Sequence, residues 1–198
     1  MGAERTGVPF NYVFARNYEV KLLESYSLVH PTEKLHQFPA KLEEGDRTGQ
    51  YLRVHLKNSA PWIGFFAMGF ESGQVASGIY SCPDPDWLCV VSGGYAYAVD
   101  ATNPQHWLQI EQRPVVEVRV VHELKLLLFI GFTTITVLGE SQRTWTSERL
   151  SWEGISISGI QGTILHGTGW DAITDKDATF EMDLSTGKSK GGARPTLK

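Results

Sequence analysis

The chain has 198 residues, of which 41% are hydrophobic, and its formal net charge is −4. This length can bury one core or two small ones, and we expect a single domain over residues 1–198. The longest apolar stretch, Leu126 to Phe132, is much shorter than the roughly 18 residues that a membrane-spanning helix needs, so no membrane partner is expected.

The N-terminal residues and the cysteines indicate a compartment. The first 20 residues contain no continuous apolar block followed by a small-residue cleavage site, so they do not predict a secretory signal peptide. Cys82 and Cys89 are the only cysteines, too few for a disulfide framework. We therefore expect two buried thiols in a cytoplasmic protein.

The charge is unevenly distributed along the chain. Residues 185–198 contain four basic side chains and no acidic one, which predicts a flexible basic tail. The rest of the chain has 14 basic and 22 acidic residues, a formal charge of −8. A body of this charge repels phosphates, so no nucleic-acid partner is expected.

Alternating apolar and polar residues predict strands along most of the chain. Residues 12–30 fit either a strand pair or a helix, and we favour strands. Further on, segments beginning at Tyr51, Val115, Thr134, Gly154 and Thr179 alternate or are β-branched. Turns are expected at residues 122–123, 133–134, 161–162 and 185–187. The short spacing predicts an antiparallel all-β fold.

One pattern recurs at an offset of 38 residues. The segment SGGYAYAVDATNPQHW, from Ser92, aligns with IGFTTITVLGESQRTW, from Ile130. The alignment places Gly93 on Gly131, Val99 on Val137 and Trp107 on Trp145. A looser third copy, FEMDLSTGK from Phe180, places Asp183 on Asp100. A period near 40 residues with four short strands is typical of a propeller blade.

These segments resemble the repeats of quinoprotein-type (PQQ-like) and WD40-like β-propellers, in which a strand ends in Asp and the next strand opens near a Trp. The resemblance covers residues 87–192, and Leu138-Gly139 replaces the Asp-Ala pair in the second copy. It implies blade-like four-stranded units at 74–110, 115–151 and 154–192, with a partial unit at 51–72 that the N-terminal strands complete or cap. This chain can hold at most four or five blades, so the alternatives are a small closed β-fold, a β-sandwich, or a homodimer that joins two halves.

Two acidic or thiol-containing segments were considered as metal sites. Asp171, Asp175, Asp177 and Glu181 could offer oxygen ligands, but their spacing does not fit a calcium-binding EF-hand loop, and a solvated hairpin turn is expected instead. The segment from Ser81 to Cys89 has too few ligands for zinc. We expect no metal and no cofactor.

No catalytic motif is present in the sequence. It lacks a G-x-S-x-G nucleophile elbow and a phosphate-binding loop, and the six histidines are scattered, so no catalytic residue is assigned. The six tryptophans are expected mainly to wedge between neighbouring sheets.

One candidate pocket nevertheless combines aromatic and polar side chains. Two nearby segments, SERLSWEG and LHGTGWD, supply its expected lining: Arg149, Trp152, His166, Trp170 and Asp171. We expect a non-catalytic binding or scaffold module that recognises a protein or peptide through a propeller-like face. The alternative is a small hydrolase or lyase that uses Arg149, His166 and Asp171.

Overall fold

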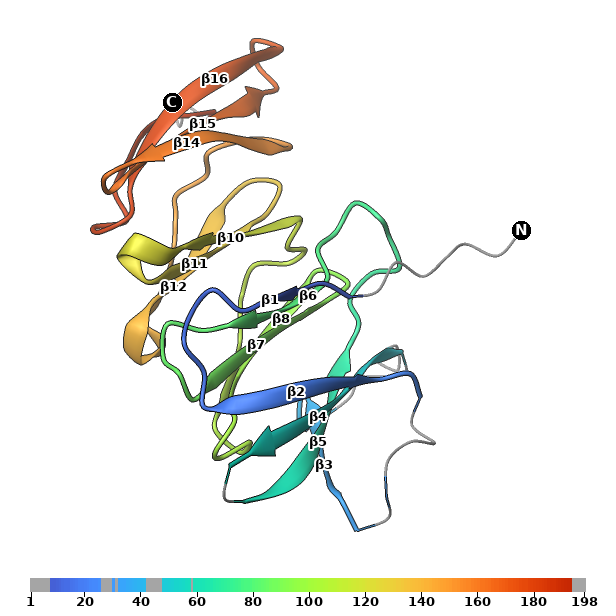
Figure 1. The fold of residues 1–198 in the computed structure, drawn as a ribbon. Coiled ribbons are helices and arrows are strands. Elements are labelled where there is room, and N and C mark those ends of the chain that lie inside the picture. Colours follow the sequence, from blue (N-terminus) through green and yellow to red (C-terminus); the bar gives the residue numbers. More distant parts are fainter. Residues whose placement is uncertain (1–7, 26–29, 31, 42–47, 58, 194–198) are drawn as a thin grey trace. The chain divides into compact units, whose positions relative to one another are not determined.

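The computed structural model describes residues 8–25, 30, 32–41, 48–57 and 59–193 (Figure 1). The described chain is all-β, as the alternation predicted, with two short 3-10 helices between strands. It divides into two compact units, Met1–Ile110 and Glu111–Lys198. In the part of the chain that the structure describes, no helix is long and apolar enough to cross a membrane.

Unit 1 contains two sheets. Sheet A has the order β1-β6-β7-β8-β9, and β1 is parallel to β6. Its strands are Phe10–Asn11, Gly78–Ser81, Trp87–Ser92, Tyr95–Asp100 and Trp107–Gln109. Sheet B has the order β2-β4-β5-β3, and β3 is parallel to β5. Its strands, in that order, are Tyr18–Leu23, Gly49–Leu56, Ser59–Ala67 and Lys34–Phe38.

The β7–β8 hairpin turns at Gly93 and Gly94, which both have positive φ. A side chain is strained in this conformation, so glycine suits both positions. The two strands are apolar on both faces, and residues such as Leu88, Cys89 and Ala98 are fully buried. Both faces of this hairpin are therefore buried, which explains why its sequence is an apolar run and does not alternate.

Aromatic side chains join the two sheets of unit 1. Phe38 stacks on Phe66 with ring centroids 4.8 Å apart, inside a core that both sheets share. Trp62 Nε1 donates a hydrogen bond to the carbonyl oxygen of Ala101 (2.8 Å), and Tyr97 Oη donates to that of Ala67 (3.0 Å). Trp62 thus has the wedging role that the sequence predicted, with its one polar atom satisfied.

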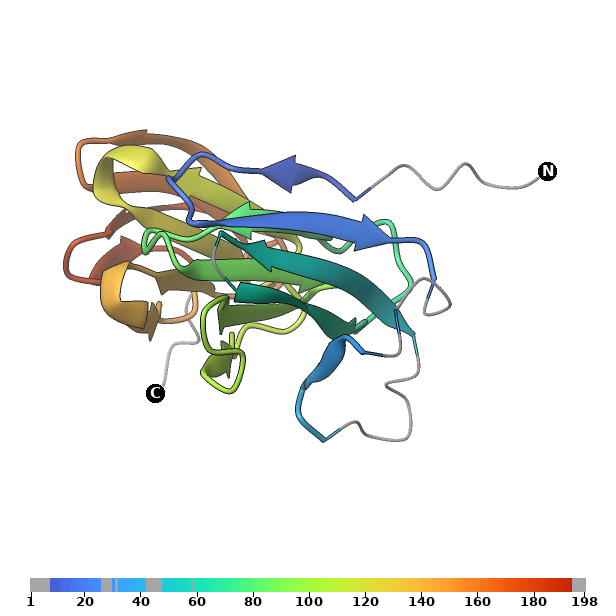
Figure 2. The same cartoon turned by 60° about the horizontal axis from the view of Figure 1, so that its bottom comes forward.

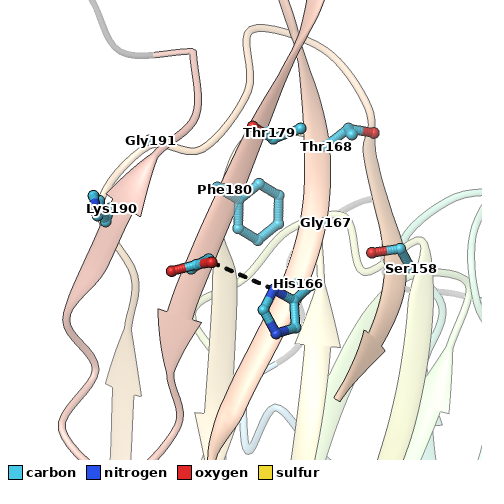
Figure 3. A pocket seen from close by; sticks show the side chains of 9 residues that line it. Ser158, His166, Gly167, Thr168, Thr179, Phe180, Lys190 and Gly191 are labelled. Atoms are coloured by element: carbon cyan, nitrogen blue, oxygen red, sulfur yellow. Dashed lines mark ion pairs between the residues drawn. The ribbon is translucent and has the colours of Figure 1, made fainter. Parts of the chain in front are cut away.

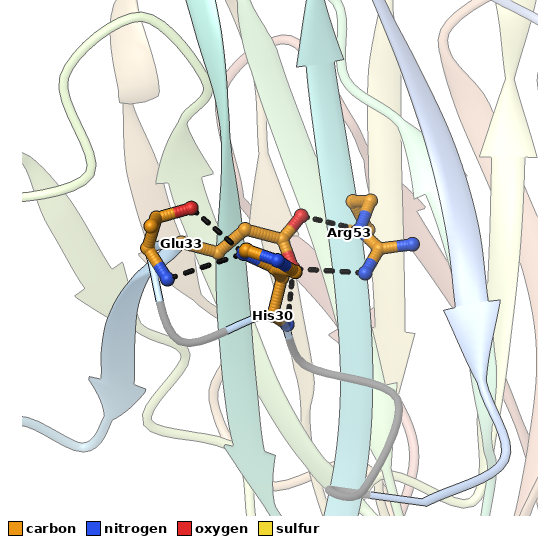
Figure 4. Close-up of polar contacts among 4 residues, drawn as sticks. His30, Glu33 and Arg53 are labelled. Carbon is orange, nitrogen blue, oxygen red and sulfur yellow. Dashed lines mark hydrogen bonds and ion pairs between the residues drawn. The ribbon is translucent and has the colours of Figure 1, made fainter.

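The outer face of sheet B carries a charged pair. Arg53 on β4 binds both carboxylate oxygens of Glu33, through Nε (2.6 Å) and through a terminal nitrogen (2.8 Å) (Figure 4). Glu33 also accepts a hydrogen bond from the backbone N–H of His30 (2.8 Å). Both charged side chains are mostly buried, with 20% of Arg53 and 12% of Glu33 exposed. The pair therefore fixes the segment before β3 against sheet B.

Unit 2 contains two four-stranded antiparallel sheets in which every strand pairs with the next along the chain. Sheet C comprises β10 to β13: Glu117–Val121, Leu126–Ile130, Ile135–Leu138 and Thr144–Thr146. Sheet D comprises β14 to β17: Ile155–Gln161, Ile164–Asp171, Lys176–Asp183 and Ser189–Gly191. The turns lie where the sequence predicted them, including the 3-10 turn at His122–Leu124.

Sheets C and D pack face to face around one core. Leu128, Ile130 and Val137 of sheet C belong to the same buried cluster as Leu165 and Phe180 of sheet D. Figure 2 shows these two sheets in yellow to orange and in orange to red. The inward and outward residues alternate along β14 and β16, as expected for strands with one solvated face.

The predicted blade-like units match observed sheets in extent. Residues 74–110, 115–151 and 154–192 contain β6–β9, β10–β13 and β14–β17, each a four-stranded antiparallel run. The N-terminal strands β2 and β3 join β4 and β5 in sheet B, as expected for the partial unit at 51–72. The described strands form four separate sheets and no closed propeller.

The aligned segments share local geometry. Val99 pairs with Trp107 in sheet A, and Val137 pairs with Trp145 in sheet C. Similarly, Asp100 and Asp183 each accept a hydrogen bond from the backbone N–H two residues later, at 2.8 and 2.9 Å. The predicted basic tail, residues 185–198, overlaps sheet D, since residues 189–191 form β17. Residues 194–198 lie outside the described residues.

Candidate functional site

Four of the five predicted site residues lie together where β14 and β15 of unit 2 meet the segment before them. The Arg149 guanidinium lies over the Trp152 ring, 5.1 Å from its centroid. The backbone N–H of Trp152 donates to the carbonyl oxygen of Trp170 (2.9 Å). Trp170 Nε1 in turn donates to Asp175 (3.2 Å). This cluster is held by local contacts between neighbouring segments.

Asp171 closes the β15–β16 turn. Its carboxylate accepts hydrogen bonds from the Thr174 hydroxyl (2.8 Å) and the Ile173 backbone N–H (3.1 Å). These two bonds, the Thr174 hydroxyl first, lower the pKa of Asp171. The Trp152 indole N–H also lowers this pKa, although it makes no hydrogen bond of normal length. An ionised, turn-closing carboxylate supports the solvated-turn interpretation of this segment.

No metal site is formed by these acids. Among the described residues, no group of three or more His, Cys, Asp or Glu side chains could hold a metal ion.

His166 lies apart from the other four predicted residues. It is in the middle of β15, five residues from Asp171, so the two side chains point to opposite faces and are about 16 Å apart along the strand. Its Nδ1 lies 3.7 Å from an oxygen of Glu181, its cross-strand partner (Figure 3). The structure therefore does not bring Arg149, His166 and Asp171 into one pocket.

His166 instead lines a shallow hollow of about 420 Å³ on the outer face of sheet D. Ser158, Thr168, Thr179 and Lys190 contribute polar side chains from the four strands. Figure 3 shows Ser158 on the strand next to that of His166. The hollow has a hydroxyl, an imidazole and a carboxylate, but the hydroxyl is not bonded to the imidazole, as an activated nucleophile requires.

Two further grooves were not predicted from the sequence. In unit 1, a groove of about 460 Å³ lies between β3 and the loop that leads into β9. We name it the β3–β9 groove; its lining is Leu35, His36, Gln37, Phe38, Ala40, Pro104, Gln105 and Trp107. Gln105 Nε2 and His36 Nδ1 are hydrogen-bonded across it (3.2 Å). Burial, and then the charge of Lys34, lowers the pKa of His36, so its imidazole is neutral at pH 7.

In unit 2, a groove of about 400 Å³ lies among three turns, β10–β11, β12–β13 and β16–β17. We name it the hairpin groove; its lining is Leu124, Lys125, Leu126, Gly139, Glu140, Ser141, Arg143, Trp145, Leu184 and Ser185. Leucines and Trp145 form its apolar part, and the Lys125–Glu140 ion pair (2.7 Å) lies at its rim.

Backbone strain accompanies the hairpin groove. Lys125, Ser141 and the adjacent Gln142 all have positive φ, between 53° and 55°. Non-glycine residues in this region each cost on the order of 1 kcal/mol or more, and such positions cluster at functional sites. The loops of this groove are therefore held in a defined, unfavourable conformation.

The two grooves are related by the 38-residue offset. Trp107 walls the groove of unit 1 and Trp145 that of unit 2, and both lie on the fourth strand of a meander, where they pair with Val99 and Val137 of the third strand. The same offset places Gln105 of the first groove on Arg143 of the second. The 38-residue offset marks both tryptophans in the sequence, which predicts inter-sheet packing for them, and both do pack against the core of their unit.

Comparisons with known proteins give no family. No protein-family model and no curated protein matches this chain. One similar solved chain is the extracellular domain of a one component system from B. thetaiotaomicron, with 8% identity and a TM-score of 0.38 over 83% of this chain. Another is a chain in the structure of S. cerevisiae Dbp5 L327V bound to Nup159, Gle1 H337R, IP6 and ADP, with 13% identity and a TM-score of 0.40 over 96% of this chain. The matches span 25% and 53% of those chains.

Proposed function

We propose that this chain is a binding module that recognises segments of partner proteins through its two tryptophan-walled grooves. The observation that carries the proposal is that a half-buried tryptophan, Trp107 or Trp145, recurs at the same cross-strand pairing position and at the wall of a groove in each unit. Tryptophan combines a large apolar surface with one polar atom, and it is enriched among residues that dominate binding energy.

The composition of the grooves supports a protein ligand. Each combines an apolar wall with a few polar side chains, which is how peptide and small-molecule sites are usually built. The hairpin groove is made from loops on a scaffold of strands, the common location of recognition sites.

A hydrolase or lyase is less well supported. The acid, base and anion-binding groups of that alternative lie on opposite faces of β15 or in separate places, and Asp171 is engaged in its turn. We therefore propose recognition without catalysis.

The test is a selection from a random 12-residue peptide library displayed on phage, with the whole chain immobilised. We expect enriched peptides whose affinity falls at least about tenfold with Trp107→Ala, Trp145→Ala or both, because tryptophan hot spots contribute about 2 kcal/mol or more. Binding is measured by fluorescence anisotropy with synthetic copies of the enriched peptides.

Phe132→Ala is the matched control, because Phe132 is an exposed aromatic residue that lines neither groove. Its substitution should leave affinity within about twofold. Peptides that bind equally well to both tryptophan variants, or no enrichment at all, would contradict the proposal.

A further inference from the structure

The β3–β9 groove runs along a strand edge. Four consecutive residues of β3, Leu35 to Phe38, line it. Among the strands that the structure describes, β3 pairs only with β5, and β9 pairs only with β8. The groove is thus bordered by the terminal strands of both sheets of unit 1. A terminal strand presents backbone N–H and C=O groups to which another strand can bind.

These two edges differ from the opposite edge of sheet B. There, β2 carries Glu19 and Lys21, two exposed charges of the kind that discourage pairing with another chain. By contrast, β9, Trp107–Gln109, has no charged residue and no proline. On β3 the one Lys, Arg, Asp or Glu is Lys34 at the first position, so the stretch that lines the groove, Leu35 to Phe38, contains none of them.

The groove offers an apolar surface beside the β3 edge. Phe38 and Trp107 are in edge-to-face contact, with ring centroids 5.6 Å apart. Phe38 is almost fully buried, whereas Trp107 is half-buried and keeps part of its ring at the groove surface. An apolar side chain placed against Trp107 would gain contact area without leaving a polar group unpaired.

The charges near the groove favour an acidic ligand. Lys34 begins β3 and Lys41 follows it, and both are exposed. None of the residues that line the groove is acidic. The nearby Glu33 is already bound by Arg53. The described residues along this edge thus present positive charge at both ends of the strand.

We infer that the β3–β9 groove binds an extended acidic segment of a partner protein, which pairs with β3 as an additional strand and places an apolar side chain against Trp107. This inference rests on the proposed function and names its binding mode and ligand class in unit 1. A strand of five residues spans about 16 Å, so five to seven residues of the partner suffice.

The test uses three pools of fluorescent octapeptides and the whole chain. The acidic pool has alternating β-branched and aromatic residues in the middle and Asp or Glu at both ends. The basic pool replaces these acids with Lys, and the third pool is the acidic one with its central amides N-methylated. We expect the acidic pool to bind at least about tenfold more tightly than either of the others.

Two further measurements locate the site. Lys34→Glu combined with Lys41→Glu should weaken the acidic pool and strengthen the basic pool, while Lys21→Glu on the β2 edge should change neither. Hydrogen exchange should slow at β3 amides when the acidic pool binds, and β2 amides should be unaffected.

Each remaining outcome overturns the inference. If N-methylation does not change the affinity but Trp107→Ala lowers it, the ligand does not pair with β3 as a strand, and the proposed function still holds. Absence of binding by the acidic pool, or protection outside β3, would place the ligand elsewhere. A dimer of this chain that competes with the peptides in light-scattering measurements would make a second copy the occupant.

Discussion

At the scale of single residues, the Arg53–Glu33 pair is the best-defined polar contact of unit 1. We expect Glu33→Gln to lower the free energy of unfolding by about 2 kcal/mol, because it replaces a bidentate, charge-assisted and mostly buried hydrogen-bonded pair with a neutral contact. Urea denaturation measures the change.

The Arg16–Glu19 pair supplies the control. Its N–O distance is 3.0 Å, but 74% of the Glu19 side chain is exposed. Glu19→Gln should therefore cost less than about 0.5 kcal/mol. Equal losses in the two variants would show that burial does not strengthen the Arg53 pair.

His36 makes stability depend on pH. Its pKa is lowered in the folded protein, mainly by burial, so the unfolded chain binds the proton more readily. Its neutral form favours folding fully above the unfolded pKa of about 6.5, and this contribution is lost as the pH falls toward the lower folded value. We expect His36→Gln to reduce the loss of stability between pH 7 and pH 5, measured by urea denaturation at each pH.

His106→Gln is the comparison for that experiment, because 75% of the His106 side chain is exposed. Its substitution should change the pH dependence less than His36→Gln does. The carboxyls of Glu33, Asp171 and Asp183 also have lowered pKa values, but their contribution is lost only at a more acidic pH. If the free energy of unfolding still falls as steeply between pH 7 and pH 5 in His36→Gln, a group other than His36 causes the pH dependence.

At the scale of elements, the two aligned glycines serve different purposes. Gly93 has φ +54°, and a Cβ there would lie 2.5 Å from Met68 Cγ and from the carbonyl oxygen of Phe70. A Cβ on Gly131 would instead lie 1.8 Å from the Gln112 side-chain amide. The alignment places a glycine at both positions. Gly93 is needed for its positive φ, whereas Gly131 is needed because a side chain there would clash with Gln112.

We expect Gly93→Ala to destabilise the protein by more than about 2 kcal/mol, because strain at positive φ adds to a backbone clash. Gly162→Ala is the matched control: its φ is +58°, but no atom lies within 4 Å of the added Cβ. It should cost only about 1 kcal/mol. Thermal unfolding of the two variants separates the cost of positive φ from the cost of the clash. Equal decreases in Tm would show that the clash contributes nothing.

Local sequence could predict the strands that pair with the next strand along the chain. The meanders β6–β9, β10–β13 and β14–β17 follow from alternation and turn residues. The parallel additions of β1 to β6 and of β3 to β5 join segments far apart in the chain, and no local pattern specifies such pairing. The β3–β9 groove was missed for the same reason, since it depends on that placement of β3.

The predicted pocket shows the limit of spacing arguments. Arg149, Trp152, Trp170 and Asp171 came together because their two segments are adjacent at one end of sheet D. His166 lies on the opposite face of β15 from Asp171, and it is four residues along the strand from Trp170, which shares its face. Proximity in the sequence thus identified the segments but not the faces.

At the scale of the whole molecule, the two units differ in how far apart in sequence their paired strands lie. Every pairing in unit 2 joins consecutive strands, whereas unit 1 also pairs Phe10 with Ile79 and Tyr18 with Leu56. Closing a longer loop costs more chain entropy before any contact compensates for it, so distant pairings form later.

We therefore expect the three meanders to become protected before β1, β2 and β3 during refolding. Pulsed hydrogen exchange during refolding from urea, read by mass spectrometry of peptic fragments, measures the order of protection. Amides of β11 and β15 should be protected in the earliest phase, and those of β2 in the last. The hairpin groove is built from turns between consecutive strands of unit 2. This groove should therefore form together with the early meanders. The β3–β9 groove needs β3 in place and should form late; protection of β2 before β15 would contradict this order.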